Sequence, residues 1–213
     1  MYDLHCHSLL GDGVLLPSEV AARYLAAGYK TIAITDHADY SNIDIVADAI
    51  LRFTRHWPKD AKIKVLPGVE LTHLPLSQFK PLAQYARKKG LKVIIGHGET
   101  ITEPVVKGTN RACLEAGIDI LAHPGFILEE DVAFAKKRGI FLEITTRRGH
   151  RDTNPHVAEL ALKIGARLIL NNDSHMPEDI IPPQELKKFG AMAGLSEADI
   201  DNIYKDLATY LKI

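Results

Sequence analysis

The sequence predicts an α/β protein built as a seven-stranded (β/α) barrel. Two observations carry this prediction. Short apolar runs alternate with amphipathic stretches along the chain, and five of those stretches end in a glycine shortly before the next apolar run. Glycine readily adopts the left-handed conformation that closes the last turn of a helix. Each unit is therefore expected to be helix, cap and strand, with caps at Gly28, Gly90, Gly117, Gly139 and Gly165.

Seven apolar runs rich in Ile, Val and Leu are the expected strands. They barely alternate with polar residues, which is typical of parallel strands covered on both faces. The glycines from 90 to 165 lie only 22 to 27 residues apart, close to the shortest spacing that holds a helix and a strand. The alternative is an open doubly wound sheet. The expected strands are Tyr2–Cys6, Thr31–Ile34, Ile63–Leu66, Lys92–Ile95, Ile118–Leu121, Ile140–Ile144 and Leu168–Leu170.

Composition indicates one ordinary globular domain spanning residues 1–213, with 46% hydrophobic and 25% charged residues. A chain this long buries roughly three quarters of its unfolded surface, so it needs no disulfide or structural metal to fold. The 26 basic and 27 acidic residues are balanced. Long nucleic acids and anionic membranes call for a basic surface, so a small substrate is expected instead. Composition does not indicate an oligomeric state.

The cysteines and the N-terminus indicate a cytoplasmic protein. Two cysteines, Cys6 and Cys113, are too few for a disulfide framework and are expected to be free thiols. The N-terminus lacks the basic and apolar regions of a signal peptide, and no window approaches 18 apolar residues. No membrane segment is therefore predicted.

Histidines and carboxylates gather at the ends of the expected strands. Six of the ten histidines lie there, whereas histidines that served only packing or solubility would be scattered. In His5-Cys6-His7 the two imidazoles are expected on one face of the strand and the thiol on the other. The carboxyl ends of barrel strands face one another, so these side chains should converge. The set is His5, His7, Asp12, His37, Glu70, His97, His123, Asp173 and His175.

Imidazoles and carboxylates without cysteine suit divalent ions such as Zn, Mn or Fe, and the donor set leaves the choice among them open. Nine candidate ligands exceed the needs of one ion and match two or three. Three dications against three carboxylates leave about three positive charges, which would attract a phosphate and make hydroxide available as a nucleophile.

The order of these motifs resembles the PHP (polymerase and histidinol phosphatase) family. The resemblance runs from residue 3 to residue 175. It is carried by His5-x-His7, Ser8 to Asp12-Gly13, Ile34-Thr-Asp-His37, Gly68-x-Glu70, His97, His123-Pro-Gly125 and Asp173-Ser-His175. The resemblance implies a distorted (β/α)7 barrel with the active site at the C-terminal ends of the strands, a trinuclear metal centre and phosphoesterase activity.

The resemblance also implies a ligand set for each ion. One ion is expected at His5, His7, Glu70 and Asp173, a second at Glu70, His97 and His123, and a third at Asp12, His37 and His175. An aspartate within Gly11-Asp12-Gly13 is equally what a turn requires, so both readings of Asp12 stay open.

Charged residues after the sixth strand are candidates for contact with a phosphate. Arg147, Arg148 and His150 are predicted to bind the substrate, and His150 to donate a proton to the leaving group. Together with His150, Glu70 and Asp173 are the predicted catalytic residues. The alternative for the arginines is a solvated surface loop. Asp36 is predicted to orient the neighbouring His37.

The predicted function is metal-dependent hydrolysis of a small phosphomonoester, similar to histidinol phosphatase. The first alternative is a phosphodiesterase or exonuclease acting on nucleotides or short oligonucleotides, although such a site would call for basic and aromatic residues around the cleft. An amidohydrolase-type C–N hydrolase is less favoured, because no lysine ends a strand here. A PHP scaffold without catalytic function is also less favoured, because all nine ligand positions are filled.

Overall fold

The structure is a computed structural model that describes residues 1–212, and its centre is a parallel sheet rolled into a barrel. The strands follow the order β1-β2-β4-β5-β6-β7-β8, and the short β3 pairs with the end of β4. All these pairings are parallel. The strands are β1 (Tyr2–Cys6), β2 (Thr31–Ile34), β3 (His37–Ala38), β4 (Lys64–Leu71), β5 (Val93–His97), β6 (Ile120–Ala122), β7 (Phe141–Thr145) and β8 (Arg167–Asn171).

The first and last strands meet, so the barrel closes at the C-terminal end of its strands. The Asp173 N–H donates to the His5 carbonyl at 3.0 Å, and the His7 N–H donates to the Ser174 carbonyl at 2.8 Å. An open doubly wound sheet would leave its edge strands apart, so that alternative is wrong. The predicted distorted barrel is confirmed.

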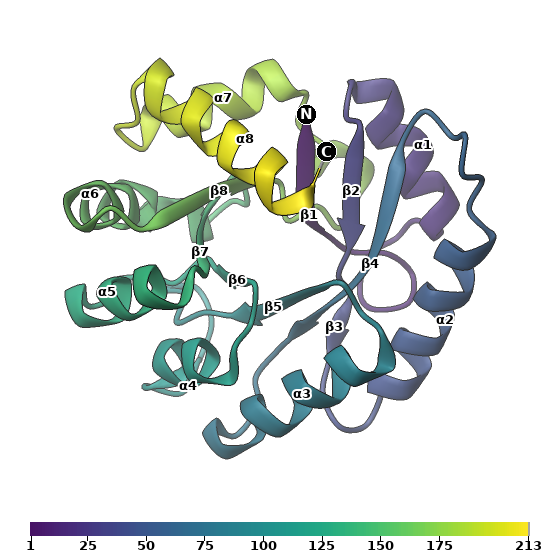
Figure 1. Ribbon diagram of the computed structural model, residues 1–213, viewed down its shortest axis with the longest axis horizontal. Coiled ribbons are helices and arrows are strands. Elements are labelled where there is room, and N and C mark those ends of the chain that lie inside the picture. The colour runs from purple at the N-terminus through teal and green to yellow at the C-terminus, as the bar shows by residue number, and fades with distance from the viewer. Residues whose placement is uncertain (213) are drawn as a thin grey trace.

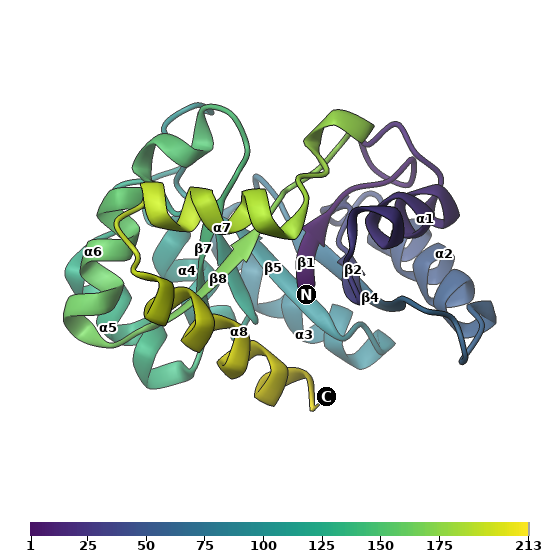
Figure 2. The same cartoon turned by 90° about the horizontal axis from the view of Figure 1, so that it is seen from above.

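Helices surround the barrel (Figure 1). The last two, α7 and α8, pack against β8 and run along one side of the molecule (Figure 2). Among residues 1–212, no helix is long and apolar enough to cross a membrane. The helices are α1 (Pro17–Ala27), α2 (Ile43–His56), α3 (Phe79–Lys89), α4 (Thr109–Ala116), α5 (Glu129–Arg138), α6 (Asn154–Ile164), α7 (Pro183–Met192) and α8 (Glu197–Leu211).

The five predicted glycine caps are confirmed. Each follows a helix and has a left-handed backbone, with φ from +69° to +109°. The seven predicted strands are also present. That the residues 1–213 form a single domain stays a prediction.

The third predicted strand is longer than the sequence indicated. It was expected to stop at Leu66, but β4 continues through Pro67 and Gly68 to Leu71. Pro67 has no N–H to donate, but its carbonyl still pairs with the neighbouring strand by accepting the Lys92 N–H at 2.8 Å. A Cβ on Gly68 would lie 2.8 Å from the carbonyl oxygen of Val93, so only glycine allows β5 to approach so closely. Glu70 therefore lies within a strand rather than after it.

The barrel interior has an apolar floor beneath a polar upper layer. Three strands show this directly, because side chains two residues apart share a face. In each of these strands an apolar floor residue is followed, two positions later, by a buried polar residue. The pairs are Ile95 and His97, Phe141 and Glu143, and Ile169 and Asn171. Leu207 of α8 completes the floor, which otherwise consists of Leu4, Ala33, Val93, Ile95, Ile120, Ala122, Phe141 and Ile169. Because the floor is packed with apolar side chains, the polar residues that could take part in chemistry lie at the C-terminal ends of the strands.

Candidate metal centre

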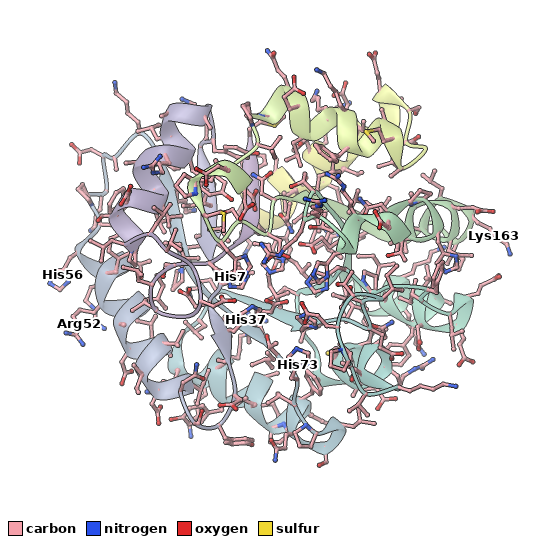
Figure 3. All side chains as sticks on the ribbon, turned by 180° about the vertical axis from the view of Figure 1, so that it is seen from behind. His7, His37, Arg52, His56, His73 and Lys163 are labelled. Carbon is pink, nitrogen blue, oxygen red and sulfur yellow. The ribbon has the colours of Figure 1, made fainter. Side chains whose placement is uncertain are left out.

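The structure brings all nine predicted ligands together in the polar layer of the barrel. Seven of them are buried, whereas His37 is partly exposed and the Asp12 side chain is 56% exposed. His7 and His37 lie near the middle of the barrel opening in Figure 3, far from the peripheral His56. As predicted, Cys6 is apart from them, buried in the hydrophobic cluster between strands and helices. That the nine residues bind ions stays a prediction.

Glu70 lies at the centre of this group. Its Oε2 is 3.2 Å from His5 Nε2, 3.5 Å from His7 Nε2 and 3.0 Å from His37 Nδ1. Its other oxygen, Oε1, is 3.7 Å from His123 Nε2. One carboxylate thus contacts four imidazoles from β1, β3 and the end of β6, which is the position of a bridging ligand.

Asp173 contacts three of the four imidazoles that Glu70 contacts. Its Oδ1 is 3.5 Å from His5 Nε2 and 3.2 Å from His7 Nε2, and its Oδ2 is 3.7 Å from His123 Nε2. Asp173 and His123 both have positive φ angles, +53° and +27°. Such backbone costs about 1–3 kcal/mol for a residue with a side chain and persists where the surroundings hold it. The chain is therefore strained at two residues that face the centre.

The ligand atoms form four overlapping groups in which all donors lie within 4.8 Å of one another. They are His5–His7–Glu70, His5–His123–Asp173, Glu70–His97–His123 and His7–Asp12–His37–His175. This division resembles the predicted one, with two differences. His7 also joins the group of Asp12, and Asp173 groups with His5 and His123 rather than with His5, His7 and Glu70. The arrangement offers two or three adjacent cation positions.

Several polar atoms of this layer lack hydrogen-bond partners, as ligand atoms would. They are both ring nitrogens of His7, Glu70 Oε1 and His123 Nδ1. Burying an unpaired polar atom is costly, and a cation would compensate for it. Burial and the neighbouring imidazoles of His37 and His175 hold the pKa of His7 well below its usual range. A neutral imidazole keeps the lone pair that binds a metal, so His7 and the unpartnered atoms of Glu70 and His123 fit divalent cations.

The two central carboxyl groups differ in acidity. Burial opposes ionisation of Glu70, but the imidazoles of His5 and His37 hold its pKa well below the usual range. Burial raises the pKa of Asp173 to about 6, with the nearby Glu70 acting in the same direction. As the pH falls, Glu70 therefore stays ionised longer than Asp173.

Glu143, inside β7, supports the centre from below and was not predicted. His5 Nδ1 lies 2.7 Å from Glu143 Oε1, to which Asn171 Nδ2 also donates at 2.8 Å. The His123 backbone N–H donates to Glu143 Oε2 at 3.1 Å. Carboxylates commonly orient metal-binding histidines in this way. The signal in the sequence was a single charged residue within the apolar run Ile140–Ile144.

Asp36 does not orient His37 as predicted. It accepts the backbone N–H of Ser8 at 2.5 Å and the Ser8 hydroxyl at 2.8 Å, which fixes the loop after β1. His37 Nδ1 instead lies 2.6 Å from Thr72 Oγ1 and close to Glu70. The Asp36 side chain points to Ser8 because a backbone donor is available there.

The predicted substrate residues divide into two kinds. Arg147 lies beside the centre, where its Nη1 donates to the Asp173 carbonyl at 3.3 Å. His150 is buried, with its ring centroid 4.4 Å from that of His123. Arg148 is exposed, and within residues 1–212 no hydrogen bond or ion pair joins it to the nine ligands. Only Arg147 and His150 are thus brought to the site.

A cleft of about 430 Å³ opens beside the centre. Its lining includes Asp12, His37, Asp39, His73 and Glu103, and no lysine or arginine is among the lining residues of the described chain. We call it the acidic cleft. The sequence did not single out Glu103, which lies in the polar loop between β5 and α4.

Comparison with known proteins agrees with this architecture. The PHP domain family model matches residues 3–101. The chain is 41% identical over 206 residues to the uncharacterized protein MJ1295 of Methanocaldococcus jannaschii, covering 94% of this chain and 93% of that protein. It is 22% identical to a "probable phosphatase" of Acetivibrio thermocellus, covering 84% of this chain and 80% of that one.

Two further similarities concern a much longer protein and a solved structure. The chain is 24% identical to the DNA polymerase/3′-5′ exonuclease PolX of Bacillus subtilis over 81% of its own length, which spans only 34% of that protein. A solved structure of a protein assigned as a histidinol phosphatase from Listeria monocytogenes superposes with a TM-score of 0.63 at 13% identity, covering 87% of this chain and 99% of that one. At such low identity the structural match shows the fold alone. Taken with the motifs and the barrel, these similarities show that the chain belongs to the PHP family.

Proposed function

We propose that this protein hydrolyses small phosphate monoesters at a centre of two or three divalent cations. The observation that carries the proposal is the convergence of the nine side chains around Glu70 and Asp173, with buried imidazole nitrogens that lack hydrogen-bond partners. The broad prediction of a phosphoesterase is confirmed by membership of the PHP family and by relatives named probable phosphatases.

Bound divalent cations would polarise the phosphate and lower the pKa of a coordinated water, so that a nucleophile is available near neutral pH. The donor set of imidazoles and carboxylates suits Zn, Mn or Fe. Glu70 would bridge two cations, because its two oxygens face different imidazoles. Glu143 would hold His5 in the orientation that points Nε2 at Glu70.

Arg147 is proposed to bind the phosphate. Its guanidinium lies beside Asp173 at the rim of the centre and is only partly buried, so its remaining N–H groups can reach a ligand. Arginine donates to phosphate oxygens in pairs of charge-assisted hydrogen bonds. Arg148 is exposed and is not included in this proposal.

His150 is proposed to donate a proton to the leaving group. Its Nδ1 lies 2.8 Å from the Thr100 hydroxyl, which fixes the ring over His123. Its Nε2 lies 3.4 Å from Glu103, so the ring sits between the centre and the loop that borders the acidic cleft.

The described lining of the acidic cleft offers no basic path for a nucleic acid strand. Binding of nucleic acid strands relies on lysine and arginine along the path of the backbone. Here three carboxylates line the cleft, those of Asp12, Asp39 and Glu103. The second candidate, an exonuclease or phosphodiesterase, is supported by the similarity to PolX and by 38% identity over 71 residues, 33% of this chain, to a 5′-3′ exoribonuclease of Haemophilus influenzae.

A reducing compartment such as the cytoplasm is proposed as the place of action. Cys6 and Cys113 are both free and buried, as expected of thiols that serve packing.

Phosphate release by protein loaded with Mn²⁺ or Zn²⁺ tests this proposal. The panel should contain histidinol phosphate, sugar phosphates, nucleoside monophosphates, bis-p-nitrophenyl phosphate and a short oligonucleotide. We expect chelator-sensitive turnover of one or more monoesters. Turnover restricted to the diester or the oligonucleotide would favour the second candidate instead.

A further inference from the structure

Glu103 contacts three imidazoles at the rim of the centre. Its Oε2 is 3.0 Å from His73 Nε2 and 3.2 Å from His97 Nε2, and its Oε1 is 3.4 Å from His150 Nε2. We propose that His73 and Glu103 form an additional divalent-cation site on the wall of the acidic cleft, next to His97 of the inner centre. We call it the rim site. Neither residue is among the nine predicted ligands.

The spacing of the rim donors is that of ligands on one ion. Neighbouring donors that each lie about 2.0–2.2 Å from a cation are about 2.8–3.6 Å from one another in octahedral or tetrahedral arrangement. The two contacts of Glu103 Oε2, at 3.0 and 3.2 Å, fall in this range. The contacts of Glu70 with His5 and His7, at 3.2 and 3.5 Å, do the same. The rim group therefore meets the geometric criterion that the inner groups meet.

His73 is held in an unfavourable backbone conformation, with φ at +52°. A residue with a side chain adopts this region at a cost of about 1–3 kcal/mol, which the surroundings must offset. Its ring lies 4.9 Å from the His97 ring, centroid to centroid, and Figure 3 shows it near the barrel opening rather than at the molecular edge. The side chain is 45% exposed, so an ion here would keep open positions for water.

The charge of the acidic cleft also favours a cation. Asp12, Asp39 and Glu103 line it, and its described lining contains no lysine or arginine to balance them. A divalent ion between His73 and Glu103 would offset part of this negative charge within the cleft.

His97 links the rim site to the inner centre. Its Nδ1 lies 3.1 Å from the Gly98 carbonyl, which leaves Nε2 as the free ligand atom. His97 belongs both to the Glu70–His97–His123 group and to the rim group of His73, His97 and Glu103. One lone pair binds one ion, so a filled inner position leaves His73 and Glu103 as the protein ligands of the rim ion. The inner group is buried, whereas Glu103 and His73 are partly exposed. We therefore expect the inner positions to fill first and the rim site to bind more weakly.

Equilibrium dialysis against rising Mn²⁺, followed by elemental analysis and by electron paramagnetic resonance of the free ion, tests the rim site. Wild-type protein should bind one Mn²⁺ more than its tightly held ions. His73→Asn and Glu103→Gln should each weaken this last ion at least tenfold and leave the tightly held ions in place. His56→Asn and Glu129→Gln, which change exposed residues away from the cleft, should bind as wild type does.

Two results would overturn the rim site. One is an equal Mn²⁺ count and affinity in wild type, His73→Asn and Glu103→Gln. The other is loss of the tightly held ions from Glu103→Gln, which would assign Glu103 to the inner centre. The test counts ions and needs no substrate, so a failure of the proposed phosphatase activity would leave its outcome unaffected.

Discussion

Glu143 Oε1 lies 2.7 Å from His5 Nδ1, on the side of the imidazole opposite to Glu70. The same carboxylate accepts Asn171 Nδ2 and the backbone N–H of His123. One buried side chain of β7 thus fixes a ligand from β1 and the backbone of another after β6. The position of two predicted ligands depends on a residue that would touch no ion.

Glu143→Gln should therefore weaken metal binding without removing a ligand. The amide would offer one acceptor oxygen where three donors now converge, so its NH₂ group would face one of them. Loss of such a supporting carboxylate costs about 10–100-fold in metal affinity. Competition with a chromophoric chelator measures this, with the exposed Glu159→Gln as control. Equal affinities in the two variants would contradict the role given to Glu143.

Arg147→Ala should impair phosphate binding. Removing a charge-assisted hydrogen bond costs about 1.5–3 kcal/mol, or roughly 10–100-fold in KM for the ester and in the inhibition constant of inorganic phosphate. Arg148→Ala is the matched control, because the neighbouring side chain is exposed. If Arg148→Ala had the larger effect, the phosphate would lie elsewhere than beside Asp173.

Metal ions should stabilise the fold. The unpaired ring nitrogens of His7 and the oxygen of Glu70 would gain partners only in the loaded protein. An ion at 100 times its dissociation constant adds about 2.7 kcal/mol, which raises the Tm of a chain this long by about 5–10 °C. Scanning calorimetry before and after dialysis against a chelator measures the change. Coincident melting curves, with bound ions shown by elemental analysis, would argue against the centre.

Leu207→Ala should lower stability and spare the centre. The side chain is 1% exposed and fills the apolar floor below the polar layer. A cavity of this kind costs about 2–5 kcal/mol. Urea denaturation should show the loss, whereas Met192→Ala, at a site 74% exposed, should change little. Loss of metal from well-folded Leu207→Ala would show that the floor and the centre are not separate layers.

Most of the fold could be predicted because its signals are local. A glycine after each of five helices and a short apolar run after each of these glycines are properties of neighbouring residues, and Gly28 and Gly165 both cap helices as expected. The end of β4 was missed because Pro67 and Gly68 usually end strands. Here Gly68 is required by contact with β5, which the sequence does not show.

The site could be predicted wherever a residue type that binds metals stands at or near the end of an expected strand. His5, Glu70 and Asp173 were found in this way. Glu143 was missed because its role depends on partners 20 or more residues away in the sequence. Glu103 was missed because a polar loop has no periodic pattern that shows which way a side chain points. Asp36 was misassigned for a related reason. Its closest donors are on Ser8, 28 positions away in the sequence.

Glu70→Gln tests the proposed centre most directly, because Glu70 contacts four of the predicted imidazole ligands. Metal content by elemental analysis and phosphate release should be measured on the same preparations, with the exposed Glu159→Gln as control. We predict that Glu70→Gln folds but loses at least one ion per chain and nearly all turnover. A Glu70→Gln protein with the full metal content and activity of the wild type would contradict the proposed centre.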